Sequence, residues 1–296
     1  GIARHQFLGR RAAGQCLDAG QQLGVGIGLG QVVVATSAQA NGLIVNAPNA
    51  HSLRIVPPLI IGDAAHLTPP FLGQGLCAGL RDAFALGWRL NAILDGKVGV
   101  DVLESYTSER IEHAKHYINF SQDLGKIICI SDPKVAADRD RSMKADLAAR
   151  NFTPVPTDLC QLGPGAWCAD TAHTGELSVQ GVVEAKGKRD RFDQAVGFGW
   201  MVLGLDADPA KALTAEQNAA LAFLGGQSVR VGAAGSGADA VDANGTYAKW
   251  LNGIGATYVL LRPDFYVAAT AATAEDLRRR FDEVMSRLHL TQPVSA

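Results

Sequence analysis

The stretch from Leu59 to Leu76, LIIGDAAHLTPPFLGQGL, constrains the fold more than any other part of the chain. Its three opening apolar residues predict a short buried strand that stops at Gly62. Asp63 then presents a carboxylate at the carboxyl end of that strand, where open α/β sheets hold their ligands. Gly75 opens a segment with helical apolar spacing, so we expect the free amides of a helix N-terminus in the same crevice. Such a site suits a polyol chain joined to a ring that gains negative charge.

The pattern GDAAHxxPPxxGQG resembles the second flavin motif of the single-component FAD-dependent aromatic hydroxylases. In that family the Asp binds the ribityl chain, and the first Pro lies over the ring where the hydroperoxide forms. The resemblance therefore assigns the ribityl contact to Asp63 and the catalytic position to Pro69. The cofactor-binding residues that it implies are Gly62, Asp63, Ala64, Pro69, Gly73, Gln74, Gly75, Leu76 and Cys77.

Cys77 stands where many members of the family have Asn, which indicates a subfamily variant, since the contacts at that position are made by backbone amides. The alternative is an ordinary strand–turn–helix with chance glycines. It is disfavoured because the match extends over the whole run rather than over a lone G-x-G.

The resemblance continues to about Met143. The pieces GLRDAFALGWRL and LESYTSER are similar to the members that hydroxylate 3-(3-hydroxyphenyl)propionate and related phenolic acids. The implied fold is α/β, with an incomplete FAD-dependent hydroxylase domain (the GD-motif strand plus helices) in residues 59–150. A Pro- and Gly-rich linker is expected in residues 151–170. A thioredoxin-like α/β domain without CxxC is expected in residues 171–296.

Residues 1–58 form an unassigned N-terminal segment. The run GVGIGLG does not fit the dinucleotide fingerprint, because a GxGxxG begun at Gly24 ends on Leu29 and one begun at Gly26 ends on Gln31. The fingerprint also needs a strand before its glycines, whereas here an apolar run follows them. We therefore expect a Gly-rich loop or strand pair. We expect either a truncated copy of the hydroxylase or a chain whose N-terminal half belongs to another polypeptide.

Two helices are predicted behind the motif. The first runs from Leu76 to Leu94, and Gly96 ends it. The second runs from Asp101 to Ile128. The residues predicted to be buried in the first helix are Leu80, Phe84, Trp88 and Ile93, and those in the second are Leu103, Tyr106, Ile111, Ala114, Ile118, Leu124 and Ile128.

Glu109 and His113 lie four residues apart and are predicted to pair on the exposed face of the second helix. With His116 they could be taken for a metal cluster. We expect no metal site, because no third and fourth ligand appear nearby in the sequence.

The last part of the chain has the order β-α-β-α-β-β-α. RFDQAVGFGWMVL and LLRPDFYVA resemble the C-terminal domain of these hydroxylases. The predicted elements are strands at 199–205, 228–231, 257–261 and 265–269, and helices at 214–224, 247–251 and from the cap at Thr273 onward. Because residues 171–296 contain no cysteine, dithiol chemistry is excluded there, and packing or dimerisation is the expected role.

Composition excludes several partners. The net charge of −2 and the lack of a basic run argue against nucleic acid. No apolar stretch approaches the roughly 18 residues that span a bilayer. The five cysteines have no CxxC spacing, which favours reduced thiols and a cytoplasmic location.

The resemblance implies an FAD-dependent monooxygenase that uses NAD(P)H and O2 to hydroxylate a phenolic aromatic acid, and a homodimer is one expected assembly. The alternative is a catalytically inactive fragment that serves as a structural or interaction module. Hydrolase and nucleotide-hydrolysing functions are disfavoured, since neither GxSxG nor GxxxxGK[ST] occurs.

Overall fold

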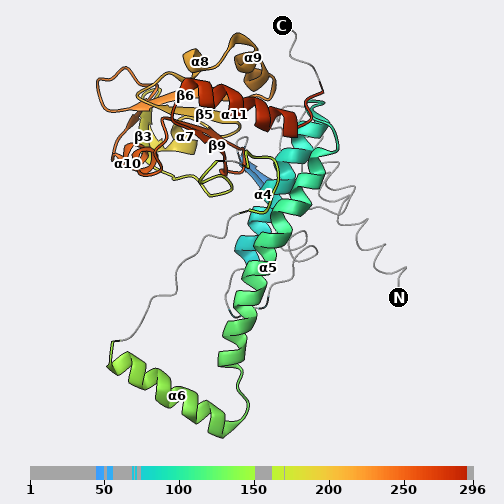
Figure 1. Ribbon diagram of the computed structural model, residues 1–296, viewed down its shortest axis with the longest axis vertical. Coiled ribbons are helices and arrows are strands. Elements are labelled where there is room, and N and C mark those ends of the chain that lie inside the picture. The colour runs from blue at the N-terminus through green and yellow to red at the C-terminus, as the bar shows by residue number, and fades with distance from the viewer. Residues whose placement is uncertain are drawn as a thin grey trace.

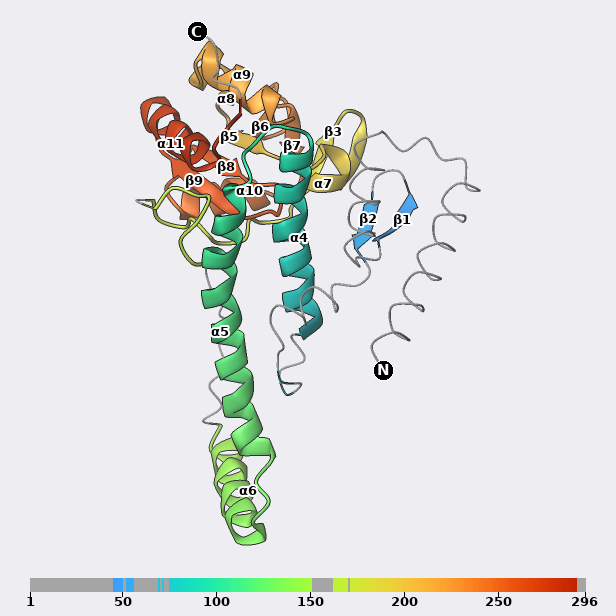
Figure 2. The same ribbon diagram turned by 90° about the vertical axis from the view of Figure 1, so that its right-hand side faces the viewer.

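A computed structural model describes residues 45–49, 52–55, 69, 71, 75–150, 162–169 and 171–291 of the protein. Two long helices, α4 (Gly75–Leu94) and α5 (Val102–Ile128), lie side by side, and a helix-covered sheet packs at one end of the pair (Figures 1 and 2). Both helices were predicted with nearly these bounds.

A small antiparallel strand pair precedes the helices. β1 (Val45–Asn49) and β2 (Ser52–Ile55) form a two-stranded sheet of their own. This pair falls in the segment that sequence analysis left unassigned. The predicted strand at 59–61 lies outside the described residues.

The turn between α4 and α5 depends on a left-handed residue. Gly96 has a φ of +67°, a conformation that glycine adopts without steric cost. Asp101 precedes α5 as its N-cap but makes no side-chain capping hydrogen bond. The predicted helix end at Gly96 is therefore confirmed.

The buried faces of the two helices differ from the predicted ones. In α4, Leu80 and Phe84 are exposed by 41% and 48%, and Trp88 is buried as predicted. In α5, Ala114 is buried as predicted, but Ile111 and Ile128 are exposed by 36% and 59%. The buried residues of α5 are Val102, Glu109, Arg110, His113, Ala114, Tyr117, Ser121 and Gly125. The prediction failed because it assigned apolar residues to the core, whereas the face that packs against α4 and the sheet domain is largely polar.

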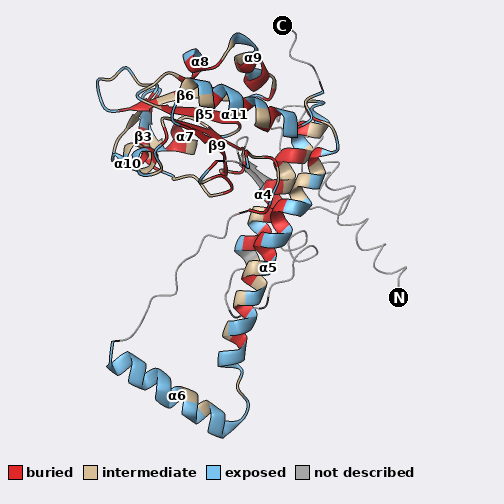
Figure 3. Ribbon diagram, in the orientation of Figure 1, coloured by how far each residue is buried: buried red, intermediate tan, exposed pale blue. Residues whose placement is uncertain are grey.

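A third helix, α6 (Pro133–Ala148), was not predicted. Asp132 caps it by accepting hydrogen bonds from the backbone amides of Lys134 and Val135, and Pro133 occupies its first turn. That Asp-Pro pair is the local signal that the sequence analysis missed. α6 has no buried residue and stands away from the sheet domain (Figure 3).

The C-terminal domain is built on a seven-stranded mixed sheet. Its strand order is β4 (Lys188–Arg191), β3 (Val182–Ala185), β7 (Ala240–Asp242), β6 (Gln227–Gly232), β5 (Met201–Leu205), β8 (Tyr258–Leu261) and β9 (Val267–Ala271). Within this sheet β5 (Met201–Leu205) pairs in parallel with β6 (Gln227–Gly232) and antiparallel with β8 (Tyr258–Leu261). β8 in turn pairs antiparallel with β9 (Val267–Ala271). These four strands confirm the predicted thioredoxin-like order.

Helices cover both faces of this sheet. On one face lie α8 (Pro209–Ala212), α9 (Ala215–Phe223) and α11 (Ala274–Arg287). On the other lie α7 (Phe192–Ala195) and α10 (Thr246–Gly253). The apolar stripe predicted for the last helix is confirmed, since Leu277, Phe281, Val284 and Leu288 are each at most 1% exposed.

Three strands and two short helices extend this predicted core. β3 (Val182–Ala185) and β4 (Lys188–Arg191) form a hairpin, and β7 (Ala240–Asp242) joins the hairpin to β6. Together with α7 and α8 they were not predicted, because all five are three or four residues long and carry little periodic signal.

The apolar core on the α11 side continues into the two long helices. Trp88 and Ala92 of α4 and Val102 of α5 belong to the same buried cluster as Trp200 and Phe281. The indole rings of Trp88 and Trp200 meet edge to face with centroids 5.6 Å apart. α4 and α5 are thus anchored to the C-terminal domain by apolar contacts.

Candidate functional site

The predicted flavin-facing residues are only partly within the described structure. Gly62, Asp63, Ala64, Gly73 and Gln74 lie outside the described residues, so their roles stay predictions. Pro69, Gly75, Leu76 and Cys77 are described, with Leu76 described in its backbone alone.

α4 begins at Gly75, at the end of the predicted motif. A Cβ at Gly75 would have no atom within 4 Å, and Cys77, two residues further on, is exposed. The first turn of α4 contains no acidic side chain. Its positive end is therefore not neutralised by its own sequence, and such an end is suited to an electron-rich group. These features fit the predicted contact between the turn amides and the edge of a flavin.

Pro69 and Phe71, which precede α4 in the sequence, contact the C-terminal half of α5. Ser121 is fully buried, and its hydroxyl donates a hydrogen bond to the Pro69 carbonyl oxygen over 2.8 Å. One turn further on, the Phe71 ring lies against Gly125. The described part of the predicted motif is therefore held by α5.

A cluster of four buried charges joins α4 and α5 to the C-terminal domain. Arg262 forms paired contacts with Glu109, with its two terminal nitrogens 2.7 and 2.9 Å from Oε1 and Oε2. It also forms paired contacts with Asp264, at 2.9 Å from Nε to Oδ1 and 2.6 Å from Nη2 to Oδ2. Arg89 lies 2.8 Å from Glu109, and the side chains of all four residues are at most 1% exposed. Two cations and two anions make the cluster electrically neutral.

Further donors complete the cluster. The Trp88 indole N–H donates to Asp264 over 3.0 Å, and the Ala166 amide donates to Glu109 over 2.7 Å. Arg89 donates through Nε to the Ser105 hydroxyl at 2.9 Å. Buried carboxylates are tolerated when several donors surround them, and this cluster meets that condition.

The cluster fixes the protonation of its carboxylates. Burial would raise the pKa of Glu109, but the guanidinium groups of Arg262 and Arg89 hold it below its usual range. Burial acts in the same direction on the pKa of Asp264, and Arg262 again lowers it. Burial would lower the pKa of Arg262, and the carboxylates of Asp264 and Glu109 raise it instead. Each of these groups therefore stays charged at neutral pH.

Residues 162–169, part of the predicted linker, pack against α5 beside this cluster. The Gly163 amide donates to the Glu109 carbonyl at 3.0 Å. A Cβ at Gly163 would lie 2.2 Å from the Ser108 carbonyl oxygen, and one at Gly165 would lie 2.1 Å from Oε1 of Glu109. Glycine is therefore required at both positions for this close approach.

The predicted exposed pair of Glu109 and His113 is wrong. Both residues are buried, at 0% and 2% exposure, and Glu109 is bound by Arg89 and Arg262. A second buried pair, Arg110 with Asp82 at 2.6 Å, lies nearby on the same two helices. Within the described residues, no group of three or more His, Cys, Asp or Glu side chains could hold a metal ion.

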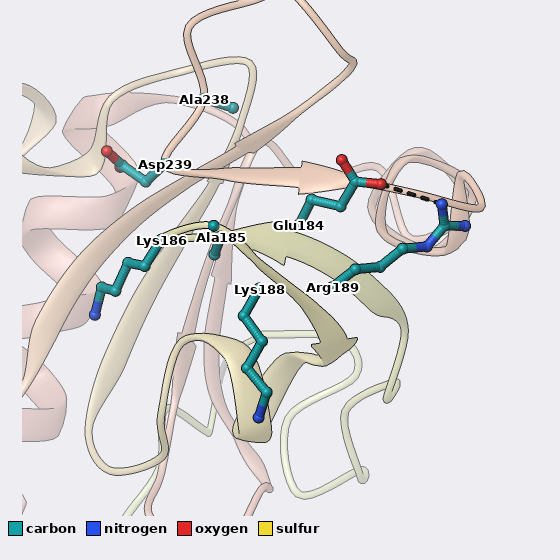
Figure 4. Close-up of a pocket in the computed structure, with 8 residues that line it drawn as sticks. Glu184, Ala185, Lys186, Lys188, Arg189, Ala238 and Asp239 are labelled. Carbon is teal, nitrogen blue, oxygen red and sulfur yellow. Dashed lines mark hydrogen bonds and ion pairs between the residues drawn. The ribbon is translucent and has the colours of Figure 1, made fainter.

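A surface depression in the C-terminal domain is unrelated to the predicted motif. It has a volume of about 380 Å³ and lies at the β3–β4 hairpin (Figure 4). Glu184 and Arg189 pair across 3.1 Å there, while the side chains of Lys186 and Lys188 extend in separate directions. These groups do not converge on a common point, so the depression offers no reactive arrangement.

The contacts of Ser121, Gly125 and Arg262 were missed by sequence analysis. A glycine inside a helix costs about 1 kcal/mol relative to alanine, so Gly125 carried a usable signal of close packing. Ser121, four residues earlier, is on the same helix face. No local signal pointed to Arg262, whose partner Glu109 is 153 residues away.

Comparison with known families places two domains on the chain. Residues 31–121 match the family described as FAD binding domain, and residues 175–287 match the HcaD C-terminal domain. The FAD-binding match begins inside the segment that sequence analysis left unassigned.

Comparison with known proteins gives the same lineage. The chain is 32% identical to a probable NADH-specific resorcinol 4-hydroxylase of Rhodococcus jostii (strain RHA1), over 74% of this chain and 41% of the relative. It is 33% identical to a 3-(3-hydroxy-phenyl)propionate/3-hydroxycinnamic acid hydroxylase of Burkholderia cenocepacia (strain HI2424), over 73% of this chain and 43% of the relative. The chain thus spans less than half the length of these relatives.

Solved structures support the fold. The flavin-dependent monooxygenase PieE, in complex with FAD and substrate, superimposes with a TM-score of 0.55 at 21% identity, over 77% of this chain and 46% of that one. Aklavinone-11 hydroxylase, with FAD and aklavinone, gives a TM-score of 0.54 at 24% identity, over 77% and 42%. The predicted resemblance to FAD-dependent aromatic hydroxylases is confirmed. In the part of the chain that the structure describes, no helix is long and apolar enough to cross a membrane.

Proposed function

We propose, from this kinship with FAD-dependent aromatic hydroxylases, that the chain provides the flavin-facing segment and the C-terminal domain of a monooxygenase. The substrate class that we propose is a phenolic aromatic acid, since relatives at 32–33% identity are named for a resorcinol and for hydroxyphenyl-propionate. NAD(P)H is the proposed reductant. The supporting observation is the start of α4 at Gly75, the last residue of the motif, with an uncharged first turn.

Bound FAD would supply the redox chemistry, in which it takes two electrons from NAD(P)H and reacts with O2, so that one oxygen atom enters the aromatic ring and the other leaves as water. In this proposal the residues of the chain bind and orient the cofactor. Asp63 accepts hydrogen bonds from the ribityl hydroxyls. The backbone amides from Gly75 onward face the edge of the ring where negative charge accumulates on reduction, and a helix end contributes on the order of 0.3–1 kcal/mol per charge.

The first experiment is FAD retention by the purified chain. The protein is mixed with FAD, unbound flavin is removed, and the visible absorbance of the protein fraction is recorded. A retained flavin spectrum supports the proposal, and a colourless protein fraction contradicts it for this chain.

Asp63→Ala tests the placement of the ribityl contact. We expect loss of FAD retention, because the substitution removes the acceptor for the ribityl hydroxyls. The matched control is Asp146→Ala, on the exposed helix α6, which should retain FAD as the wild type does. Undiminished retention by Asp63→Ala would show that the ribityl chain binds elsewhere.

The competing proposal is a structural or interaction module without catalysis. It is favoured by the complete apolar core of the C-terminal domain, where both faces of the sheet are covered. The same retention experiment separates the two proposals, since a module of this kind has no need to bind flavin.

A further inference from the structure

The Pro69 carbonyl oxygen is held by a side chain that does not belong to the predicted motif. Ser121 could satisfy its hydroxyl inside its own helix, where serine commonly donates to the carbonyl one turn earlier. Its hydroxyl instead donates to Pro69, 52 residues away, at 2.8 Å. Ser121 is fully buried and Pro69 partly buried, so the donor side of this bond is shielded from water.

Gly125 of α5 makes a second contact of this kind, with the ring of Phe71. A Cβ at this position would lie 2.6 Å from Cε2 and 2.7 Å from Cδ2 of Phe71. Carbon atoms do not approach so closely, so the Phe71 ring can occupy this position only because Gly125 has no side chain. Glycine inside a helix is otherwise unfavourable relative to alanine.

Ser121 and Gly125 are four residues apart, one turn of α5, and therefore lie on one face of the helix. Pro69 and Phe71 are two residues apart in the sequence and precede α4. Ser121 thus contacts Pro69 through a hydrogen bond, and Gly125, one turn further along α5, contacts Phe71 through close packing.

We propose that Ser121 and Gly125 are positioning residues that fix the positions of Pro69 and Phe71. That Pro69 faces the flavin ring rests on the proposed function above. If it does, α5 determines where the Pro69 backbone stands relative to the ring and to the amides at the start of α4. Neither residue itself contacts the reacting atoms in this proposal.

Ser121→Ala is the first test, with Ser108→Ala as its matched control on the same helix. Ser108 is exposed, and its hydroxyl hydrogen-bonds to the carbonyls of Glu104 and Ser105 in its own helix. Hydrogen exchange, measured by mass spectrometry on the free protein, should become about two- to tenfold faster in the peptide covering residues 71–76 of Ser121→Ala. Ser108→Ala should leave that peptide unchanged.

FAD affinity gives a second measurement on the same two proteins. We expect the Kd for FAD, from quenching of flavin fluorescence, to rise about two- to tenfold in Ser121→Ala and to stay constant in Ser108→Ala. Ser121→Thr, which keeps the hydroxyl, should restore both the exchange rate and the Kd toward the wild-type values.

A double-mutant cycle tests the second contact even if Ser121→Ala folds poorly. Gly125→Ala alone should displace Phe71 and speed exchange in the same peptide. In the Phe71→Ala background the added methyl group has room, so the same substitution should have no such effect. Gly253→Ala is the control, because a Cβ there meets nothing within 4 Å.

The outcomes separate the two proposals. Faster exchange in Ser121→Ala together with coupling between positions 125 and 71 supports the positioning role. If the wild type shows this exchange pattern but does not bind FAD, the positioning role stands and the hydroxylase function fails for this chain. Unchanged exchange in Ser121→Ala, or equal effects of Gly125→Ala in both backgrounds, would falsify the positioning role.

Discussion

α11 and α5 each bury one face, but the buried face of α11 is apolar whereas that of α5 is largely polar. The buried stripe of α11 consists of Leu277, Phe281, Val284 and Leu288. The corresponding face of α5 includes Glu109 and Arg110, each at 0% exposure. The hydrophobic period therefore located the core side of α11 and mislocated that of α5. Apolar spacing identifies a buried face only where the partner surface is apolar as well.

The two faces also differ in what a substitution leaves behind. Around α11, a truncated side chain leaves a cavity. Around Glu109, a neutralised side chain leaves two guanidinium groups with a single carboxylate between them. A buried cation without its partner is among the costliest defects in a folded protein.

The largest effect is therefore expected for Glu109→Gln. Arg89 and Arg262 would keep only Asp264 as a counter-charge, so the free energy of unfolding should fall by about 3–5 kcal/mol. Urea unfolding would measure it. The control is Glu112→Gln on the same helix, whose pairing with Lys115 is 61% exposed on both sides and should matter by less than about 0.5 kcal/mol. Equal effects of Glu109→Gln and Glu112→Gln would show that the buried ion cluster contributes no more than an exposed pair. The contrast between the polar face of α5 and the apolar face of α11 would then not hold.

The same cluster should make the protein sensitive to acid. The pKa values of Glu109 and Asp264 lie below their ordinary values of 4.5 and 3.8 in the folded protein. A lowered carboxylate pKa contributes stability that is present above the unfolded-state value and is lost as pH falls through the folded-state value. The difference in unfolding free energy between wild type and Glu109→Gln should thus be constant above about pH 5 and shrink in more acidic solution. A difference independent of pH would contradict the assignment.

For the apolar face, Leu277→Ala should lower the unfolding free energy by about 2–5 kcal/mol, through lost burial and a residual cavity. Leu277 is 1% exposed, whereas Leu147 on α6 is 70% exposed. The same substitution at Leu147 should change stability by less than about 0.5 kcal/mol. Unlike Glu109→Gln, Leu277→Ala should keep its effect unchanged in acid, which sharpens the comparison of the two faces.

The smallest expected effect concerns the helix starts. The Thr273 hydroxyl caps α11 by accepting from the Asp276 amide at 3.1 Å, so Thr273→Ala should cost about 1 kcal/mol in thermal or urea unfolding. Asp101 precedes α5 without a side-chain cap. Asp101→Ala should accordingly cost less than about 0.5 kcal/mol, leaving only its interaction with the helix dipole. A larger loss at Asp101 than at Thr273 would reverse this order.

The elements that could be predicted are those specified by neighbouring residues. Thr273 with Asp276 marked the start of α11, and Gly96 marked the end of α4. Asp132-Pro133 carried the same kind of information for α6 and was overlooked. The β3–β4 hairpin gave too short a pattern to be recognised.

The candidate site could be predicted only where a motif carried it. The GDAAHLTPPFLGQG pattern predicted the lineage, which the comparisons confirm, while the roles of Asp63 and Gln74 stay predictions. Ser121 and Arg262 act through partners 52 and 153 residues away, and such pairs leave no trace in local spacing. Their contacts could be found only in the folded chain.

The length of α5 has a mechanical consequence. Glu109, near its start, is clamped to the C-terminal domain, and Ser121 lies twelve residues further on, about 18 Å along the helix axis. A continuous helix is stiff over that distance, so a small tilt at the clamp becomes a larger sideways shift at its far end. α5 thus couples the ion cluster mechanically to Pro69, because a change in helix orientation at the cluster moves Ser121 and its hydrogen-bond partner.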